Sequence, residues 1–291
     1  MRRFDYYAPG SLSEALSILQ ERGDGGKLLA GGTDLLVQMR EAGLHPSYVV
    51  SLRRLPELRG IEFDEGAGLR IGACADMAAI EAHPAVRQRY RALFEGASLI
   101  GSVQTRNMAT IGGNICNAAP SADSAPPLMV LGAVAEVAGP GGGRALAVED
   151  LFTGPGTTAL GPNDILMALR LPVPPPHTGS VYQRHTPRQE MDIAVVGVGV
   201  ALTFQPDGEA IQGARIGLGA VAPTPIRARE AEDTLTGQRP SEELFAQAAE
   251  LAVAASRPIS DVRGSAAFRR ELVRVMTRRC LGIALERART T

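Results

Sequence analysis

Apolar residues in the first part of the chain alternate between helical spacing and short continuous runs. Leucine and alanine recur three and four positions apart within residues 11–22, which predicts an amphipathic helix with a serine cap at its start. The remaining elements expected here are strands at 27–30 and 48–52 and, between them, a helix at 33–42. Together they predict a first unit that spans residues 1–56.

Strand and helix signals are mixed in the next stretch of the chain. Residues 61–73 read as a strand, a glycine turn and a second strand, and Asp76 can cap a helix. Residues 108–119 show neither helical nor strand periodicity and are expected to form a loop interrupted by glycines. The other elements expected are helices at 76–82, 84–99 and 125–131 and strands at 133–138 and 165–171, which complete a second unit over 57–172.

A proline-rich segment at 172–176 is the clearest linker, because proline cannot donate a hydrogen bond to a sheet. Beyond it, the pattern predicts strands at 180–186, 193–205 and 211–220, followed by helices at 241–255 and 260–288. Strands followed by helices predict a third unit over 178–288. The fold class predicted for the whole chain is α+β.

Composition narrows the possible functions. The 31 acidic and 30 basic residues give a net charge of -1, which disfavours a nucleic-acid binder. The three cysteines and four histidines show no metal-binding spacing, so no zinc or iron–sulfur site is expected. Scattered cysteines and the lack of an apolar leader favour the cytoplasm. The longest apolar run has about 12 residues, too few for a membrane span.

A double glycine lies between the strand expected at 27–30 and the helix that follows it. Without a Cβ atom the backbone can approach a ligand closely, and the amide groups at the start of the helix can bind a phosphate. The candidate residues of this first loop are Leu29, Ala30, Gly31, Gly32, Thr33, Asp34 and Leu35. An ordinary tight turn before a capped helix explains the same residues.

A second double glycine lies in the aperiodic segment at 108–119. Its candidate binding residues are Thr110, Ile111, Gly112, Gly113 and Asn114. A long surface loop is the alternative, but loops of this length are uncommon unless they are functional. Neither loop matches the Rossmann or P-loop glycine motif. Two such loops would suit a pyrophosphate held between two units.

Four other features are candidates for a functional role. Cys116 could touch a ligand, but a small buried residue is the favoured interpretation. Asp192 could be catalytic, but it is favoured to order a domain interface. His185 could donate a hydrogen bond to a ligand, but an exposed histidine is the favoured interpretation. A final set of arginines could form either a docking surface or a solvated helix face, the latter being favoured; it comprises Arg263, Arg269, Arg270, Arg274, Arg278 and Arg279.

Seven segments in order along the chain resemble the FAD-binding medium subunit of the molybdenum hydroxylases. That family includes aerobic carbon monoxide dehydrogenase and the bacterial split forms of xanthine dehydrogenase. The segments are 30–34, 104–107, 110–114, 119–123, 154–156 with Thr158, 192–194 and 219–225. Each is weak alone, whereas the ordered set covers nearly the whole chain.

The resemblance implies a two-subdomain FAD-binding fold of the vanillyl-alcohol-oxidase (PCMH) type, plus a C-terminal α+β domain with a small antiparallel sheet and helices. FAD would lie between the first two units, with its pyrophosphate on the two glycine loops. Asp123 would lie near the ribityl chain or the phosphates, and the backbone of Leu166 would contact the ring system. Arg184 stands where many relatives carry lysine, and Ile193 where some carry an aromatic residue. No histidine matches those used for covalent attachment, so dissociable FAD is expected.

The function implied is that of an electron-relay subunit with no catalytic residue or metal of its own. Electrons would pass from a large molybdopterin subunit, through a small [2Fe-2S] subunit, to FAD and then to an external acceptor of unknown identity. Two alternatives remain open at this point. One is a stand-alone FAD-dependent oxidoreductase of the same superfamily, and the other is a non-catalytic nucleotide-binding or assembly protein.

Overall fold

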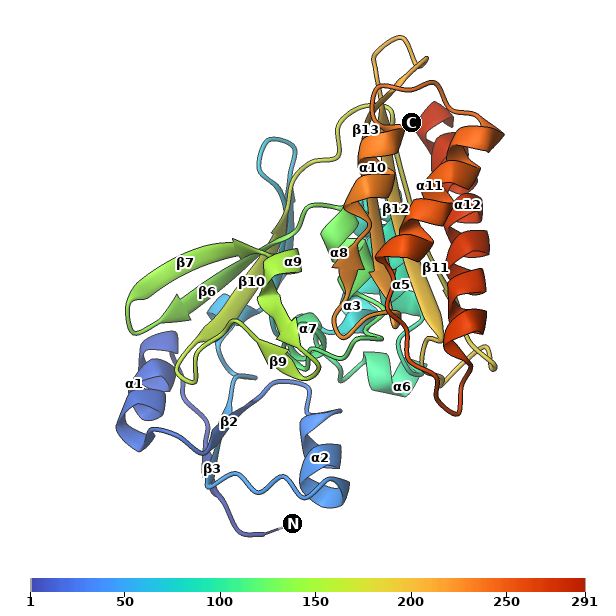
Figure 1. Cartoon of the computed structure of the whole chain (residues 1–291). Coiled ribbons are helices and arrows are strands. Elements are labelled where there is room, and N and C mark those ends of the chain that lie inside the picture. Colours follow the sequence, from blue (N-terminus) through green and yellow to red (C-terminus); the bar gives the residue numbers. More distant parts are fainter. Residues whose placement is uncertain (1, 291) are drawn as a thin grey trace.

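Residues 2–290 are described by a computed structural model, in which four sheets and the surrounding helices follow chain order (Figure 1). The first unit is a parallel three-stranded sheet in the order β1-β3-β2. Parallel strands need a crossover, which α2 supplies between β2 and β3. The elements are β1 (Asp5–Tyr7), α1 (Leu12–Arg22), β2 (Gly26–Leu29), α2 (Leu35–Glu41), β3 (Tyr48–Ser51) and a 3-10 turn, η1 (Pro56–Leu58).

The second unit is built on an antiparallel five-stranded sheet in the order β4-β5-β10-β6-β7. Its strands are β4 (Ile61–Asp64), β5 (Gly68–Gly72), β6 (Val134–Gly139), β7 (Gly142–Ala147) and β10 (Ile165–Leu171), with a small ribbon of β8 (Phe152–Gly154) and β9 (Thr157–Thr158). Its helices are α3 (Met77–Ala82), α4 (Pro84–Arg89), α5 (Arg91–Ser98), α6 (Val103–Arg106), α7 (Ile111–Cys116), α8 (Ala125–Val130) and α9 (Val148–Leu151).

Three expectations for the second unit were wrong. The helix expected at 84–99 is two helices, because Tyr90 leaves the helical conformation with φ -118° and ψ 54°. The loop expected at 108–119 contains α7, which Thr110 caps by accepting a hydrogen bond from the Gly113 amide. Strand β7 was missed because most of its residues are exposed and show no apolar alternation.

The C-terminal unit is an antiparallel sheet in the order β11-β12-β13-β14, covered on one face by long helices (Figure 1). Its elements are β11 (Thr178–His185), β12 (Val196–Phe204), β13 (Ile211–Gly219), β14 (Ile226–Arg227), α10 (Arg229–Leu235), α11 (Glu242–Ala255) and α12 (Ala266–Thr290). β12 starts later than expected because 186–195 form a loop, and α12 starts later because a turn occupies 261–264.

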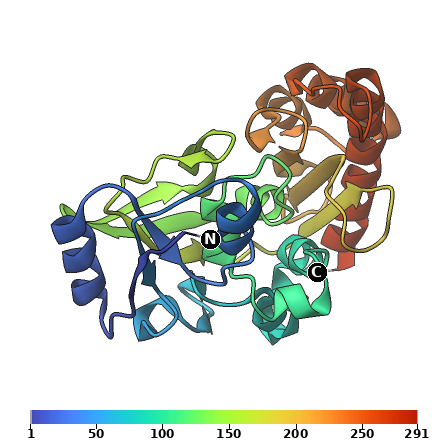
Figure 2. The ribbon, with the colours of Figure 1, turned by 90° about the horizontal axis from the view of Figure 1, so that it is seen from below.

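Helix α8 joins the second unit to the C-terminal sheet. Gly199 on β12 pairs with Gly217 on β13. A Cβ atom on Gly199 would lie 3.2 Å from the Pro126 backbone, and one on Gly217 would lie 2.9 Å from it. Glycine at these positions therefore allows the helix to lie directly on the sheet. Figure 2, seen from below, shows the first unit in front of the second and the C-terminal unit to the right.

Three clusters of buried apolar side chains are centred on the three units, and two of them include residues of a neighbouring unit, such as Ile165 and Tyr182. The boundaries 1–56, 57–172 and 178–288 stay predictions, but the α+β class is what the sheets and helices display. Within residues 2–290, no helix is both long and apolar enough to cross a membrane.

One of the C-terminal arginines is buried, contrary to the expected solvated helix face. The Arg269 side chain is 4% exposed, and its Nη1 donates to the carbonyl oxygens of Val195 (2.6 Å) and Ala220 (3.1 Å). Its Nη2 donates to Asp261 Oδ1 at 2.7 Å. Arg269 therefore ties the start of α12 to the ends of the sheet strands. Two others, Arg274 and Arg278, pair with glutamates on α11 or α12.

Replacement of Arg269 by alanine should lower the free energy of unfolding by about 3 kcal/mol, because two buried carbonyls and one carboxylate lose a charged donor. Chemical denaturation would measure the loss. The matched control is Arg270→Ala at the exposed neighbouring position, expected to stay within about 0.5 kcal/mol. Equal stability of the two variants would contradict the structural role of Arg269.

Candidate functional site

The two glycine loops, which belong to different units, lie in direct contact. A Cβ atom on Gly31 would lie 2.1 Å from the carbonyl oxygen of Met108 and 3.0 Å from Ala109 Cα. Next to it, Gly32 has φ +80°, a conformation that favours glycine. A side-chain bond adds to the contact, since Gln38 Nε2 donates to Asn117 Oδ1 at 3.0 Å. The loops are therefore brought together as the sequence analysis expected.

The first loop presents unused amide groups. The N–H groups of Gly31, Gly32, Thr33 and Asp34 make no hydrogen bond to any other residue in the range 2–290. Asp34 occupies the start of α2 without a side-chain cap. Consecutive free amides at the start of a helix favour an anionic ligand.

The second loop differs, because most of its amides already have acceptors. The Ile111 and Gly112 amides donate to the Ala75 and Ala73 carbonyls at 3.0 and 2.9 Å, and the Gly113 amide donates to Thr110 Oγ1. A Cβ atom on Gly112 would lie 2.6 Å from the Ala73 oxygen. This double glycine therefore packs α7 against the end of β5. The free donors lie on the first loop.

The segment that follows α7 is held from two sides. The amide of Gly156 donates to the Ala118 carbonyl at 3.0 Å, and the amide of Ala220 donates to the Pro120 carbonyl at 2.7 Å. Ala118 and Ala220 have φ +48° and +63°, a region that non-glycine residues seldom adopt. Segments 154–156 and 219–225 thus position the chain just before Asp123.

Asp123, Tyr182 and Arg184 form a buried polar group, called here the Asp123 cluster. The Tyr182 hydroxyl donates to Asp123 Oδ1 at 2.7 Å, and Arg184 Nη1 pairs with Oδ2. Burial raises the pKa of Asp123 to about 6, although Arg184 and Tyr182 lower it. Burial also raises the Tyr182 pKa well above its usual value, so this hydroxyl remains a donor.

One hydrogen-bond donor of Arg184 is unused within the described residues. Its side chain is 3% exposed, yet its Nη2 has no hydrogen-bond partner within the described chain. An unpaired buried guanidinium nitrogen carries a desolvation cost, which an acceptor on a ligand would remove. Arg184 is therefore placed to contact a ligand next to Asp123.

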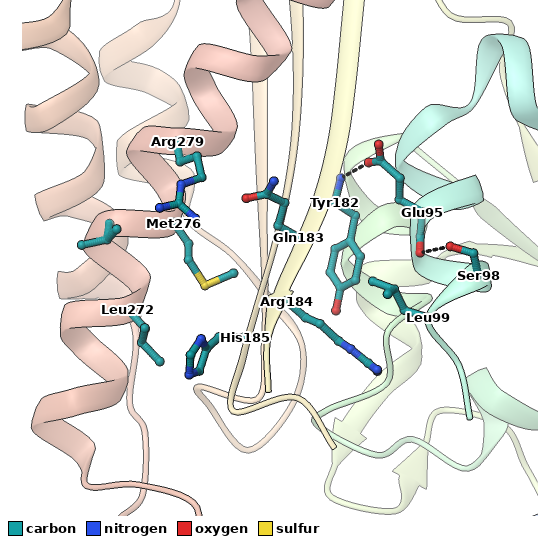
Figure 3. A pocket seen from close by; sticks show the side chains of 11 residues that line it. Glu95, Ser98, Leu99, Tyr182, Gln183, Arg184, His185, Leu272, Met276 and Arg279 are labelled. Atoms are coloured by element: carbon teal, nitrogen blue, oxygen red, sulfur yellow. Dashed lines mark hydrogen bonds between the residues drawn. The ribbon is translucent and has the colours of Figure 1, made fainter. Parts of the chain in front are cut away.

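A hollow of about 540 Å³ adjoins this cluster at the open edge of β11, between α5 and α12. Figure 3 shows Tyr182 and Arg184 on the side of Leu99, and Gln183 and His185 on the side of α12. Contrary to expectation, His185 is not exposed: it is half-buried, with its ring edge-on to Phe268 at a centroid distance of 5.9 Å.

The remaining candidates have local roles. Leu166 is buried in β10 beside a bulge in its pairing with β6. Cys116 is half-buried and not fully buried as expected, and desolvation still raises its pKa to about 12, which agrees with an unreactive thiol. Asp192 accepts hydrogen bonds from the Ile193 and Arg188 amides, which lower its pKa, so it orders its own loop and not a domain interface.

Ile193 itself is 47% exposed. Among the described residues, no three histidine, cysteine or acidic side chains gather as a metal site would require.

Sequence reasoning missed Tyr182. It precedes Arg184 by two positions on one strand, so both side chains lie on the same face of β11. That spacing was a usable signal once Arg184 had been selected.

Comparison with known proteins covers almost the whole chain. Residues 2–174 match the model of the FAD binding domain in molybdopterin dehydrogenase, and residues 182–284 that of the CO dehydrogenase flavoprotein C-terminal domain. The carbon monoxide dehydrogenase medium chain of Afipia carboxidovorans is 36% identical over 98% of both chains. The xanthine dehydrogenase FAD-binding subunit of Escherichia coli O157:H7 is 34% identical over 97% of this chain and 96% of its own.

Solved structures give the same picture. The reconstituted CO dehydrogenase from Oligotropha carboxidovorans superposes with a TM-score of 0.93 at 34% identity, over 98% of this chain and 99% of that one. Quinoline 2-oxidoreductase from Pseudomonas putida 86 superposes with a TM-score of 0.90 at 30% identity, over 99% and 98% of the two chains.

The packing role of the second loop can be tested with Gly112→Ala. The added methyl group would press on the Ala73 carbonyl, so the free energy of unfolding should fall by about 2 kcal/mol. Gly10→Ala is the control, because the nearest atom to its methyl group is a glutamate oxygen at 3.8 Å. Thermal unfolding measures both, and an unchanged Gly112→Ala variant would contradict the packing seen here.

Proposed function

Because the chain belongs to the family of FAD-binding medium subunits of molybdenum hydroxylases, we propose that its two glycine loops and its Asp123 cluster hold the FAD. Membership confirms the resemblance carried by the seven sequence segments and the expected FAD-binding α+β fold. The chain is the FAD-binding electron-transfer subunit of a heteromeric oxidoreductase.

The free amides of the first loop support the position proposed for the pyrophosphate. Four consecutive N–H groups at the start of α2 lack an acceptor, and the helix dipole adds a positive potential there. The second loop would form the opposite wall, since Met108 and Ala109 touch Gly31. The Thr110 hydroxyl and the Asn114 amide nitrogen would supply side-chain donors, and Ile111, Gly112 and Gly113 a close-packed backbone.

The Asp123 cluster suits the uncharged polar part of the cofactor. A carboxylate only accepts hydrogen bonds and repels phosphate, so Asp123 would bind hydroxyl groups of the ribityl chain. Arg184 Nη2, which has no acceptor in the protein, would donate to the flavin end. The buried Leu166 would border the ring through its backbone.

Bound FAD supplies one- and two-electron transfer, which links one-electron centres to a two-electron acceptor. The protein positions the cofactor and sets its surroundings. An arginine guanidinium carries a positive charge, so Arg184 would place that charge beside the ring. The pairing of that charge with Asp123 limits the net charge in the buried site.

Multi-subunit relatives support partner chains for this subunit. We propose that a large molybdopterin subunit and a small [2Fe-2S] subunit deliver the electrons and that an external acceptor removes them. A cytoplasmic location is proposed as well, because none of the three cysteines forms a disulfide.

The purified chain alone is expected to bind FAD without a covalent link and to show a flavin spectrum that dithionite bleaches reversibly. Acid precipitation should release all of the flavin. Turnover of organic substrates should require the partner subunits. Substrate turnover by the chain alone would favour the stand-alone oxidoreductase, and a bound nucleotide that dithionite does not bleach would favour the assembly protein.

Gly31→Ala should weaken FAD binding about tenfold or more, because its methyl group separates the loops and displaces amides that bind a charged group. Flavin fluorescence titration would measure the dissociation constant at a temperature where circular dichroism shows a folded chain. The control is again Gly10→Ala, expected to bind FAD like the unmodified chain. Unchanged affinity in Gly31→Ala would refute the role proposed for the first loop.

A further inference from the structure

We infer that Tyr182 is a positioning residue of the cofactor site: its hydroxyl fixes the orientation of the Asp123 carboxylate toward FAD. The inference rests on the proposed function, since it assumes that Asp123 faces the cofactor. Tyr182 is 3% exposed, and its hydroxyl lies 2.7 Å from Asp123 Oδ1. With Arg184 on Oδ2, both oxygens are held by one strand.

The strand that carries Tyr182 is itself held in place. The Tyr182 amide donates to Glu95 Oε2 on α5 at 2.8 Å, as drawn in Figure 3. The other oxygen of Glu95 accepts from Arg287 Nη2 on α12 at 2.6 Å, and Arg287 Nη1 donates to the Ser180 carbonyl at 2.7 Å. A continuous polar chain therefore runs from α12 through α5 and β11 to the cofactor side of Asp123.

The contacts of Tyr182 fix its backbone as well as pack its ring. β11 is the edge strand of its sheet, so its outward amide at Tyr182 would lack a partner without Glu95. With the backbone held, the rigid ring places its hydroxyl at one point. A carboxylate with both oxygens engaged cannot rotate freely, which prepares its remaining lone pairs for a ligand.

The protonation state of Asp123 makes the inference testable. The charged or titratable groups that face its carboxylate are Arg184 and Tyr182 on β11. Helix α5 presents Gly96 to the Asp123 backbone, while its Glu95 faces the Tyr182 amide instead. Helix α7 presents the neutral Asn114 to the adjacent Ser124.

The bond from Tyr182 lowers the pKa of Asp123, so its removal must raise that pKa above about 6. An ionised carboxylate accepts hydroxyl donors at both oxygens, and a protonated one does so less well. FAD affinity should therefore fall as the pH falls through this pKa. The fall should begin at a higher pH when the tyrosine hydroxyl is missing.

The experiment is FAD titration of the full chain across pH, in the unmodified protein and in Tyr182→Phe. In the variant, the midpoint of affinity against pH should move up by about one unit, and the dissociation constant at pH values below both midpoints should rise about tenfold. In Asp123→Asn this pH dependence should disappear. These readouts do not depend on turnover.

Tyr90→Phe is the matched control. Tyr90 is also fully buried and also donates its hydroxyl, in this case to the Pro172 carbonyl at 3.1 Å. Tyr90→Phe loses a similar hydrogen bond, but its midpoint of FAD affinity against pH should equal that of the unmodified chain. An unmoved midpoint in Tyr182→Phe, or an equal shift in Tyr90→Phe, would overturn the inference. Failure of the unmodified chain to bind FAD would instead overturn the proposed function.

Discussion

The close approach of two backbones at Gly31 is the constraint on which the site depends. The first unit reaches the second through a loop whose glycine leaves room for the carbonyl of Met108. Any side chain at this position would separate the loops and move the free amides of α2 away from the second unit. Glycine at this position therefore allows the first two units to approach each other at these loops.

The segment before Asp123 is ordered at the expense of backbone strain. Ala118 and Ala220 adopt left-handed conformations. The Ala118 carbonyl accepts a hydrogen bond from the Gly156 amide, and the Ala220 amide donates one to the Pro120 carbonyl. Strain of this kind persists only where surrounding contacts determine the backbone. The strained positions lie beside the Asp123 cluster, where a precise geometry has functional value.

The Asp123 cluster combines stability and function in one buried group. Desolvation disfavours an ionised aspartate, and the neighbouring arginine and tyrosine offset part of that effect. The unpaired nitrogen of Arg184 leaves the cluster incomplete in the protein alone. A ligand that accepts a hydrogen bond from this nitrogen would complete the cluster. Cofactor binding and the order of the Asp123 cluster are therefore expected to be coupled.

The sequence by itself determined the order of the main sheets and long helices and the two double glycines, because these follow from local periodicity and turn residues, whereas Asp123 and Arg184 were selected through the family resemblance. Tertiary structure alone decided which amides are free, since Ala73 and Ala75 occupy those of the second loop from a distant part of the chain. It also decided that Arg269 is buried and that Tyr182 holds Asp123. The physical reason is that burial and hydrogen-bond partners depend on residues far apart in sequence, which no local pattern records.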